Sequence, residues 1–226
     1  MVKKRKKKKR RLRLKRILLF IIVLLLIGYL CFLFLNQTIT NIFISGNHYL
    51  TDQQIIEYSG LDEYPKLIDS LNYKVMKKLE NNKLIKNVKV YKRKLTNIYI
   101  VIEENRPLYY DSVENKTILL DNNKVNQIFQ VPTLINYIPD TKIEKFQKKI
   151  KEINIDILSR ISDIEYSPNE VDKNRLLLTM NDGNYVYITI NKLPNMNNYV
   201  NIVKEFGGKK GILYLDSGEY FKIMED

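Results

Sequence analysis

The sequence predicts an α+β protein carried on a single membrane-spanning helix. Residues 17–35 form a continuous apolar run without a charged side chain. Beyond this run, short segments of alternating apolar and polar residues are separated by Gly, Asn and Asp turns, which favours strands paired as hairpins. Segments with helical apolar spacing lie among these strands. Strands and helices mixed in this way are typical of helices packed on an antiparallel sheet.

The positive charge of the chain is concentrated at its N-terminus. The sequence has 38 Lys and Arg against 25 Asp and Glu, a net charge of +13. Twelve of the basic residues lie between Lys3 and Arg16 with no acid among them, so 26 basic and 25 acidic residues remain elsewhere. A nearly neutral body excludes a basic nucleic-acid-binding fold and leaves only a basic arm.

The apolar run has the length of a membrane span. A helix over Ile17–Leu35 would be about 28 Å long, close to the hydrocarbon thickness of about 30 Å. The rival interpretation is a cleaved signal peptide, whose apolar region is shorter and ends in small residues. The chain contains no alanine, and Leu30 rather than a small residue precedes Cys31. We therefore expect an uncleaved transmembrane helix.

The basic tail predicts the orientation of this helix. Positive residues flanking a span stay on the cytoplasmic side, so residues 1–16 are expected inside and residues 36–226 outside. The charges nearest the helix are the candidate orientation determinants: Lys9, Arg10, Arg11, Arg13, Lys15 and Arg16. The tail can also contact anionic lipid, at about 1 kcal/mol per basic side chain. Recruitment of DNA by the tail is a weaker alternative.

The first part of the external region predicts the order strand, helix, helix, strand, strand. Thr51 and Gln54 form a capping-box pattern before a short helix that Gly60 ends. The expected elements are a strand at Asn41–Ser45, helices over 52–59 and 67–79, and strands at Val88–Tyr91 and Ile98–Ile102.

The second part, beyond Pro107, predicts hairpins with two longer helices. Asn181-Asp182-Gly183-Asn184 is a strong hairpin turn between two strands. Strands are expected at 108–110, 118–120, 164–166, 175–180, 185–190, 212–215 and 220–224, and helices at Ile143–Ile161 and Asn197–Phe206.

The sequence offers little catalytic chemistry. His48 is the only histidine, which excludes a multi-histidine metal site, and Cys31 lies within the membrane helix. Glu103 and Glu104 are adjacent on a predicted strand, so their side chains point to opposite faces and cannot flank one substrate. We expect no catalytic residue, cofactor or metal, and no disulfide in the external part.

Several ordered motifs make the chain resemble the FtsQ/DivIB family of bacterial cell-division proteins. Residues 42–47 (IFISGN) are similar to the family's opening strand V-x-V-x-G-N, and 98–107 (IYIVIEENRP) to its boundary motif I-x-V-x-E-x-x-P. Further similar segments follow in the family's order: Asn87–Arg93, Leu119–Asp121, Pro132–Leu134 and Gly218–Phe221.

The resemblance implies a fold and a function. It implies a POTRA domain at 38–106 and a β domain at 107–226. It also implies a non-catalytic scaffold at the division septum, with single-pass coiled-coil partners of the DivIC/FtsB and FtsL type and, through them, the septal peptidoglycan synthase. The alternative from another class is a membrane-anchored cell-wall enzyme or binding receptor.

The last predicted strand is the candidate partner site. Residues 220–224 are expected at an open sheet edge, where a partner strand can pair with unused backbone groups. Tyr220 is the candidate anchor, since tyrosine is enriched at binding hot spots, and Lys222 can meet acidic residues on a partner. Phe221 is expected to point to the core instead. The complete predicted patch is Tyr220, Lys222, Ile223, Tyr199 and Val203.

Overall fold

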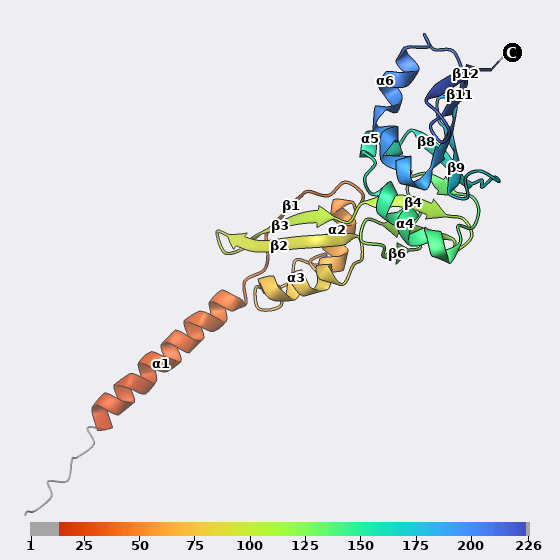
Figure 1. Cartoon of the computed structure of the whole chain (residues 1–226). Helices are drawn as coiled ribbons and strands as arrows, with labels where there is room; N and C mark the ends of the chain where they lie inside the picture. Colours follow the sequence, from red (N-terminus) through yellow and green to blue (C-terminus); the bar gives the residue numbers. More distant parts are fainter. Residues whose placement is uncertain (1–13, 225–226) are drawn as a thin grey trace, which may run out of the picture. The chain divides into compact units, whose positions relative to one another are not determined.

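The computed structural model describes residues 14–224 and divides into two compact units (Figure 1). The first unit comprises the residues up to Asn82 together with Asn87–Glu103. The second unit comprises Lys83–Lys86 and the residues from Glu104 onward. The α+β fold class predicted from the sequence is confirmed.

The apolar run forms one helix, α1 (Leu14–Leu35). Its 22 residues correspond to a length of about 33 Å, and by length and composition it can cross a membrane. The helix includes two of the predicted orientation determinants, Lys15 and Arg16. The other four, Lys9, Arg10, Arg11 and Arg13, lie outside the described residues.

The first unit has the predicted order of elements. These are β1 (Asn41–Ser45), α2 (Asp52–Ser59), α3 (Asn72–Glu80), β2 (Ile85–Arg93) and β3 (Asn97–Glu104). Strand β3 is central, with β1 parallel to it on one side and β2 on the other, where the two arrows run in opposite directions (Figure 1). The buried side chains of α2 and α3 include Ile55, Val75 and Leu79.

The local sequence patterns predict the bounds of α2 correctly and those of α3 only in part. The Thr51 hydroxyl accepts from the Gln54 backbone N–H and the Gln54 side chain accepts from Thr51, which completes the capping box. Helix α3 begins at Asn72, so the prediction of a helix from residue 67 is wrong. Residues 66–68 pair instead with the segment after α1, because Leu67 N–H donates to the Gln37 carbonyl at 2.8 Å.

The second unit contains one long mixed sheet. Its strands are β4 (Pro107–Asp111), β5 (Lys116–Leu119), β6 (Lys124–Val125), β7 (Thr133–Leu134), β8 (Ile161–Tyr166), β9 (Arg175–Met180), β10 (Tyr185–Thr189), β11 (Gly211–Tyr214) and β12 (Tyr220–Ile223). Their order across the sheet is β12-β11-β10-β9-β8-β7-β4-β5-β6. The predicted hairpins are antiparallel. The pairs β4–β7, β7–β8 and β10–β11 are parallel, so the sheet is mixed.

The predicted long helix over 143–161 is wrong. The structure has α4 (Asp140–Ile150), a turn, α5 (Ile155–Leu158) and then strand β8 from Ile161. The apolar side chains keep their periodic spacing because all three elements bury them in the same core. Ile161 belongs to the sheet because it pairs with Met180 on β9. This pairing with a distant residue cannot be predicted from the local spacing of apolar residues.

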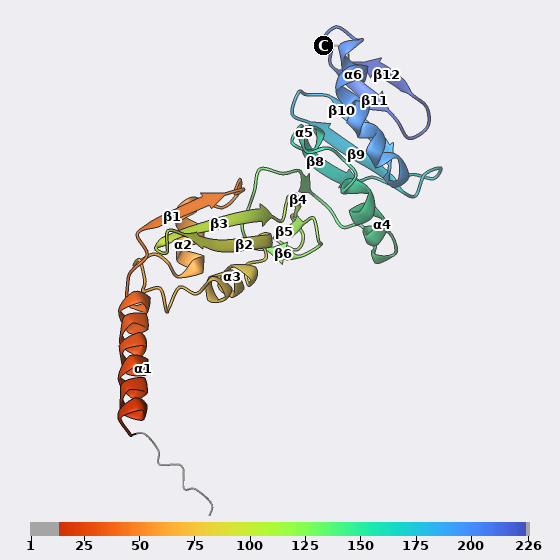
Figure 2. The same cartoon turned by 90° about the vertical axis from the view of Figure 1, so that its left-hand side faces the viewer.

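One face of this sheet is covered by helices (Figure 2). The predicted helix over 197–206 is shorter, with a 3₁₀ helix, η1 (Ile190–Asn198), leading into α6 (Tyr199–Lys204). Side chains of α4 and η1 pack with alternate residues of β9 and β10 in one core, including Phe146, Leu193, Leu178 and Val186. The residues between those core positions, among them Tyr187, lie on the other, helix-free face of the sheet.

Candidate partner-binding edge of the second sheet

Strand β12 lies at one end of the sheet, and within residues 14–224 no strand pairs with its other side. It runs antiparallel to β11, with Lys222 opposite Ile212. Met224 N–H donates to the Lys210 carbonyl at 3.0 Å, so by the alternation of an antiparallel ladder Lys222 also bonds inward. The backbone groups of Phe221 and Ile223 therefore point away from the sheet.

Three tyrosines form a ladder across the helix-free face and end at this edge. Tyr187, Tyr214 and Tyr220 stand in register on β10, β11 and β12. Their rings stack in sequence, with centres 5.4 Å and 4.5 Å apart. Such cross-strand aromatic pairs stabilise a sheet. Tyr220 is the outermost ring and is 52% exposed, so the ladder carries an aromatic surface out to the open edge.

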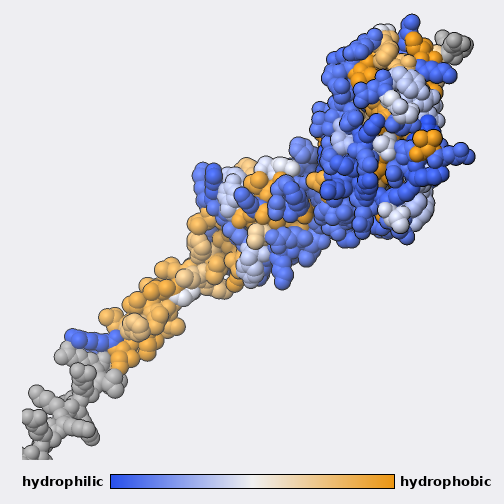
Figure 3. Space-filling view, in the orientation of Figure 1, coloured by the Kyte–Doolittle hydropathy of each residue, from blue (hydrophilic) through white to orange (hydrophobic). Residues whose placement is uncertain are grey.

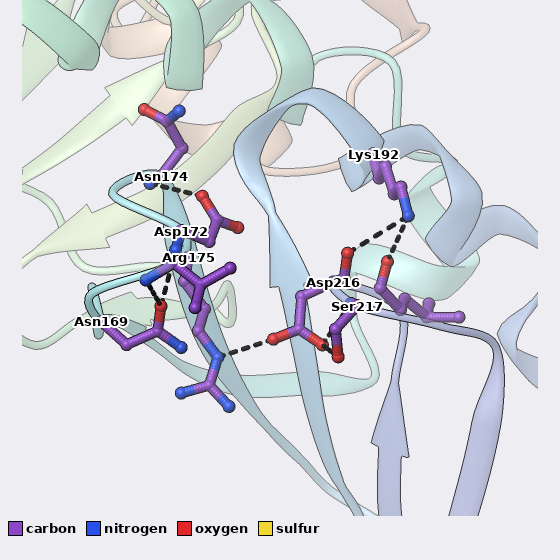
Figure 4. A network of polar contacts seen from close by, with 9 residues as sticks. Asn169, Asp172, Asn174, Arg175, Lys192, Asp216 and Ser217 are labelled. Atoms are coloured by element: carbon purple, nitrogen blue, oxygen red, sulfur yellow. Dashed lines mark hydrogen bonds and ion pairs between the residues drawn. The ribbon is translucent and has the colours of Figure 1, made fainter.

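A polar network supports the inner end of the ladder, and Figure 4 shows the part of this network around Arg175 and Asp216. The Arg175 guanidinium lies over the Tyr187 ring, with its carbon 3.6 Å from the ring centre. Arg175 Nε donates to Asp216 Oδ2 at 2.7 Å, and both side chains are largely buried. Lys192 Nζ donates to the carbonyl oxygens of Leu215 and Asp216 at 3.0 and 3.3 Å. These contacts hold the turn between β11 and β12.

The environment of Asp216 favours its ionised form. Burial acts to raise the pKa of this carboxyl, but the hydrogen bonds from Arg175 and Ser217 outweigh burial and leave the pKa below its usual value. The carboxylate therefore stays charged and anchors the turn.

On the helix-covered face of the sheet, β12 approaches β11 closely at Gly211. A Cβ at Gly211 would lie 2.4 Å from the Lys222 carbonyl oxygen and 2.5 Å from the Phe221 ring. The Phe221 ring covers this position and stacks on Phe206, with ring centres 4.2 Å apart. Only glycine at 211 allows this approach. The prediction that Phe221 faces the core is confirmed.

The structure divides the predicted patch between different surfaces. Tyr220 and Lys222 lie together on the helix-free face, and both are exposed. Ile223 is 44% exposed but faces the other side with Phe221. Val203 is partly buried and packs against the core. Tyr199 is 1% exposed, so its inclusion in a contact surface is wrong.

Tyr199 has a structural position that sequence reasoning missed. Its hydroxyl donates to Asp182 at 2.8 Å and accepts from Asn184 Nδ2 at 3.0 Å. Asn184 Oδ1 in turn accepts from Gly211 N–H at 2.9 Å. Burial, with the Asp182 carboxylate as its hydrogen-bond acceptor, raises the pKa of Tyr199 well above its usual value. This network ties the β9–β10 turn to the start of β11.

Sequence reasoning also missed the ladder and its support, namely Tyr187, Tyr214, Arg175 and Asp216. The only signal in the sequence is a tyrosine at an alternate position of each strand. That signal can be interpreted only when the register of β10, β11 and β12 is known.

No group of three or more His, Cys, Asp or Glu side chains within residues 14–224 is placed to hold a metal ion. Glu103, one of the two adjacent acidic residues considered above, accepts a hydrogen bond at its Oε2 from Asn87 Nδ2 at 2.7 Å.

Comparison with known proteins gives the family. Residues 37–105 match the model of the FtsQ-type POTRA domain. DivIB of Listeria monocytogenes is 32% identical over 203 residues, which cover 85% of this chain and 75% of that protein. DivIB of Bacillus subtilis is 31% identical over 195 residues, covering 81% and 73%. DivIB of Bacillus cereus is 34% identical over 195 residues, covering 82% and 76%.

A solved structure is also similar. It is the major extracytoplasmic domain of DivIB from Geobacillus stearothermophilus, with a TM-score of 0.36 and 20% identity, covering 43% of this chain and 88% of that one. The assignment rests on the sequence relatives, each of which matches more than four fifths of this chain. The chain belongs to the DivIB family of membrane-anchored cell-division proteins.

Proposed function

We propose that this protein is a non-catalytic scaffold of the bacterial division machinery, concentrated at the septum and acting through protein contacts of its external domains. Its POTRA domain would span residues 38–106 and its β domain residues 107–226. The observation that carries the proposal is the open edge of β12, where Phe221 and Ile223 direct backbone groups away from the sheet beside the exposed Tyr220. This edge can accept a partner strand.

The partners are those that the family resemblance implies, single-pass coiled-coil proteins of the DivIC/FtsB and FtsL type. Backbone hydrogen bonds to β12 would supply affinity, and Tyr220 would supply an aromatic anchor. Lys222 would meet acidic side chains of the partner and would disfavour indiscriminate strand pairing. Through these partners the protein would support the septal peptidoglycan synthase.

A pair of substitutions at Ile223 tests strand pairing directly. Ile223→Pro removes an N–H that points away from β11, so the ladder within the protein stays complete. Ile223→Ala removes most of the same side chain but keeps the N–H. We expect the proline variant to lose capture of the DivIC-like partner and the alanine variant to retain most of it. Equal capture by both variants would contradict pairing through β12.

A second test concerns the charge of the edge. Lys222→Glu should weaken partner capture while the melting temperature stays nearly unchanged, because Lys222 is exposed. Deletion of residues 220–226 should abolish capture. If capture survives both changes, the interface lies elsewhere on the protein.

The orientation is proposed from the basic tail, with the N-terminus in the cytoplasm and both domains outside. In intact spheroplasts, external protease should digest the chain from Asn36 onward and leave the tail protected. Cleavage of the tail from outside would reverse the assignment.

The role in division is tested by depletion in the source organism. We expect filaments that lack septa, since the scaffold would be needed to assemble the septal synthase. Normal septation with an altered wall would instead favour a cell-wall enzyme or receptor.

A further inference from the structure

The segment that follows α1 is tied directly to the first unit. Ile68 N–H donates to the Leu35 carbonyl at 3.2 Å, and Leu67 N–H to the Gln37 carbonyl at 2.8 Å. Ile39 N–H donates to the Pro65 carbonyl at 3.0 Å. Residues 65–68 are therefore held beside the last turn of the membrane helix by backbone hydrogen bonds.

The tip of the β2–β3 hairpin lies at the same end of the unit. Thr40 N–H donates to the Thr96 carbonyl at 3.0 Å, and the two hydroxyl groups are also 3.0 Å apart. Lys94 and Leu95 form the tip with positive φ angles of 49° and 65°. This conformation is unfavourable for both residue types, and it leaves Leu95 52% exposed.

A groove of about 290 Å³ joins the hairpin tip to the helix end. Its apolar lining comes from Phe34, Leu35, Leu67, Leu71 and Leu95, and its basic lining from Lys92 and Lys94. Phe34 and Leu35 are the last two residues of α1, so the groove lies at the level where the span leaves the hydrocarbon. Figure 3 shows the apolar surface of α1 continuing into the adjoining end of the first unit.

Ile68 and Lys92, at the same end of the first unit, also suit a membrane interface. Ile68 is 46% exposed beside the helix end. Lys92 Nζ donates to the Ser70 carbonyl at 2.7 Å, which holds its ammonium at the groove. Apolar side chains next to ammonium groups are the combination that membrane interfaces favour, with the apolar part among acyl chains and the charges at phosphates.

We propose that this groove and the hairpin tip bind the phospholipids of the leaflet at the Leu35 end of α1. Leu95 and Ile68 enter the interfacial layer, and Lys92 and Lys94 contact lipid phosphate groups. The POTRA domain is thereby held at the membrane surface and does not reorient freely about the end of the membrane helix. This surface is separate from the β12 edge and independent of the partner proposed there.

Site-directed spin labelling of the full chain in phospholipid nanodiscs tests the contact. In a Cys31→Ser background, Leu95→Cys places the label at the hairpin tip. Ser45→Cys is the matched control, since it is exposed and lies four residues along β1 from Asn41, about 13 Å farther from the helix end. Accessibility to oxygen reports lipid and accessibility to a water-soluble nickel chelate reports water.

We expect the label at 95 to lose nickel accessibility and gain oxygen accessibility relative to the label at 45. The only other protein in a nanodisc is the scaffold belt at its rim, so the same protection in liposomes, which lack a belt, assigns it to lipid. Equal nickel accessibility at both positions, with unchanged circular dichroism, would overturn the proposal.

The lipid headgroup gives a second arm. Replacing phosphatidylcholine with phosphatidylglycerol should move the label at 95 deeper, and Lys94→Gln should reduce that shift. Lys77→Gln on α3 is the control for charge alone and should leave the shift unchanged. If Lys77→Gln reduces the shift as much as Lys94→Gln does, the assigned contact at the hairpin tip is wrong.

Discussion

The guanidinium carbon of Arg175 lies 3.6 Å from the centre of the Tyr187 ring, and this contact joins a buried ion pair to an exposed sheet edge. On one side Arg175 donates to Asp216, which holds the turn before β12. On the other side Tyr187 stacks on Tyr214, and Tyr214 on Tyr220. The conformation of Tyr220 at the proposed partner site is thus supported by a chain of contacts that begins on β9.

Arg175→Met should destabilise the second unit. The substitution keeps an apolar side chain over Tyr187 but leaves the Asp216 carboxylate, 6% exposed, without its cation. Removal of one partner of a largely buried pair costs about 3–5 kcal/mol. The measurement is the free energy of unfolding in urea. The double variant Arg175→Met with Asp216→Asn is the control and should recover part of the loss; no recovery would mean that the ion pair is not the cause.

Asp216 predicts a specific dependence of stability on pH. Its pKa in the folded protein lies below its usual value, so its contribution is fully present above the unfolded pKa of about 4 and is lost as pH falls through the folded pKa. Urea unfolding of the wild type and Asp216→Asn should therefore differ at neutral pH. The difference should shrink on acidification below pH 4. A difference that stays constant across this range would contradict the assignment.

Gly211→Ala should displace β12 from the sheet. The new Cβ would meet the Lys222 carbonyl at 2.4 Å and the Phe221 ring at 2.5 Å, and overpacking of this kind costs about 1–3 kcal/mol. We expect a lower melting temperature and weaker partner capture. Gly218→Ala is the matched control, because its nearest contact would be an ordinary 3.4 Å from the Tyr220 ring. A similar loss in both variants would show that the close approach at 211 is unimportant.

Tyr199→Phe should affect stability without affecting the proposed interface. The change removes the donor to Asp182 and the acceptor for Asn184, at a cost of about 1–2 kcal/mol. Partner affinity of the folded fraction should stay unchanged because the ring is buried. Tyr185→Phe, at an exposed tyrosine on β10, is the control and should change neither stability nor partner affinity. Loss of affinity in Tyr199→Phe alone would place this residue near the partner.

Part of the candidate site follows from local patterns. Tyr220 and Lys222 alternate with Phe221, and this period of two is enough to separate the exposed side chains from the core side chain. The role of Tyr199 does not follow in the same way. Its helical position near Val203 is compatible with a surface, and only the approach of Asp182 and Asn184 from the β9–β10 turn explains its burial.

Taken alone, the sequence determined the features that depend on neighbouring residues. The uncharged run specifies α1, the Thr51–Gln54 capping box specifies the start of α2, and the turn at residues 181–184 specifies the β9–β10 hairpin. Each depends on interactions within a few positions along the chain, such as continuous apolarity, a cap hydrogen bond or a turn conformation.

Only the tertiary structure decided how these elements join. The two residues Thr133 and Leu134 form β7, which pairs in parallel with both β4 and β8 and so unites two groups of hairpins in one sheet. Strand β11 pairs in parallel with β10, which aligns Tyr187 with Tyr214. The physical reason is that a strand's partners and register are set by backbone hydrogen bonds and buried side chains from distant segments, and no local pattern contains them.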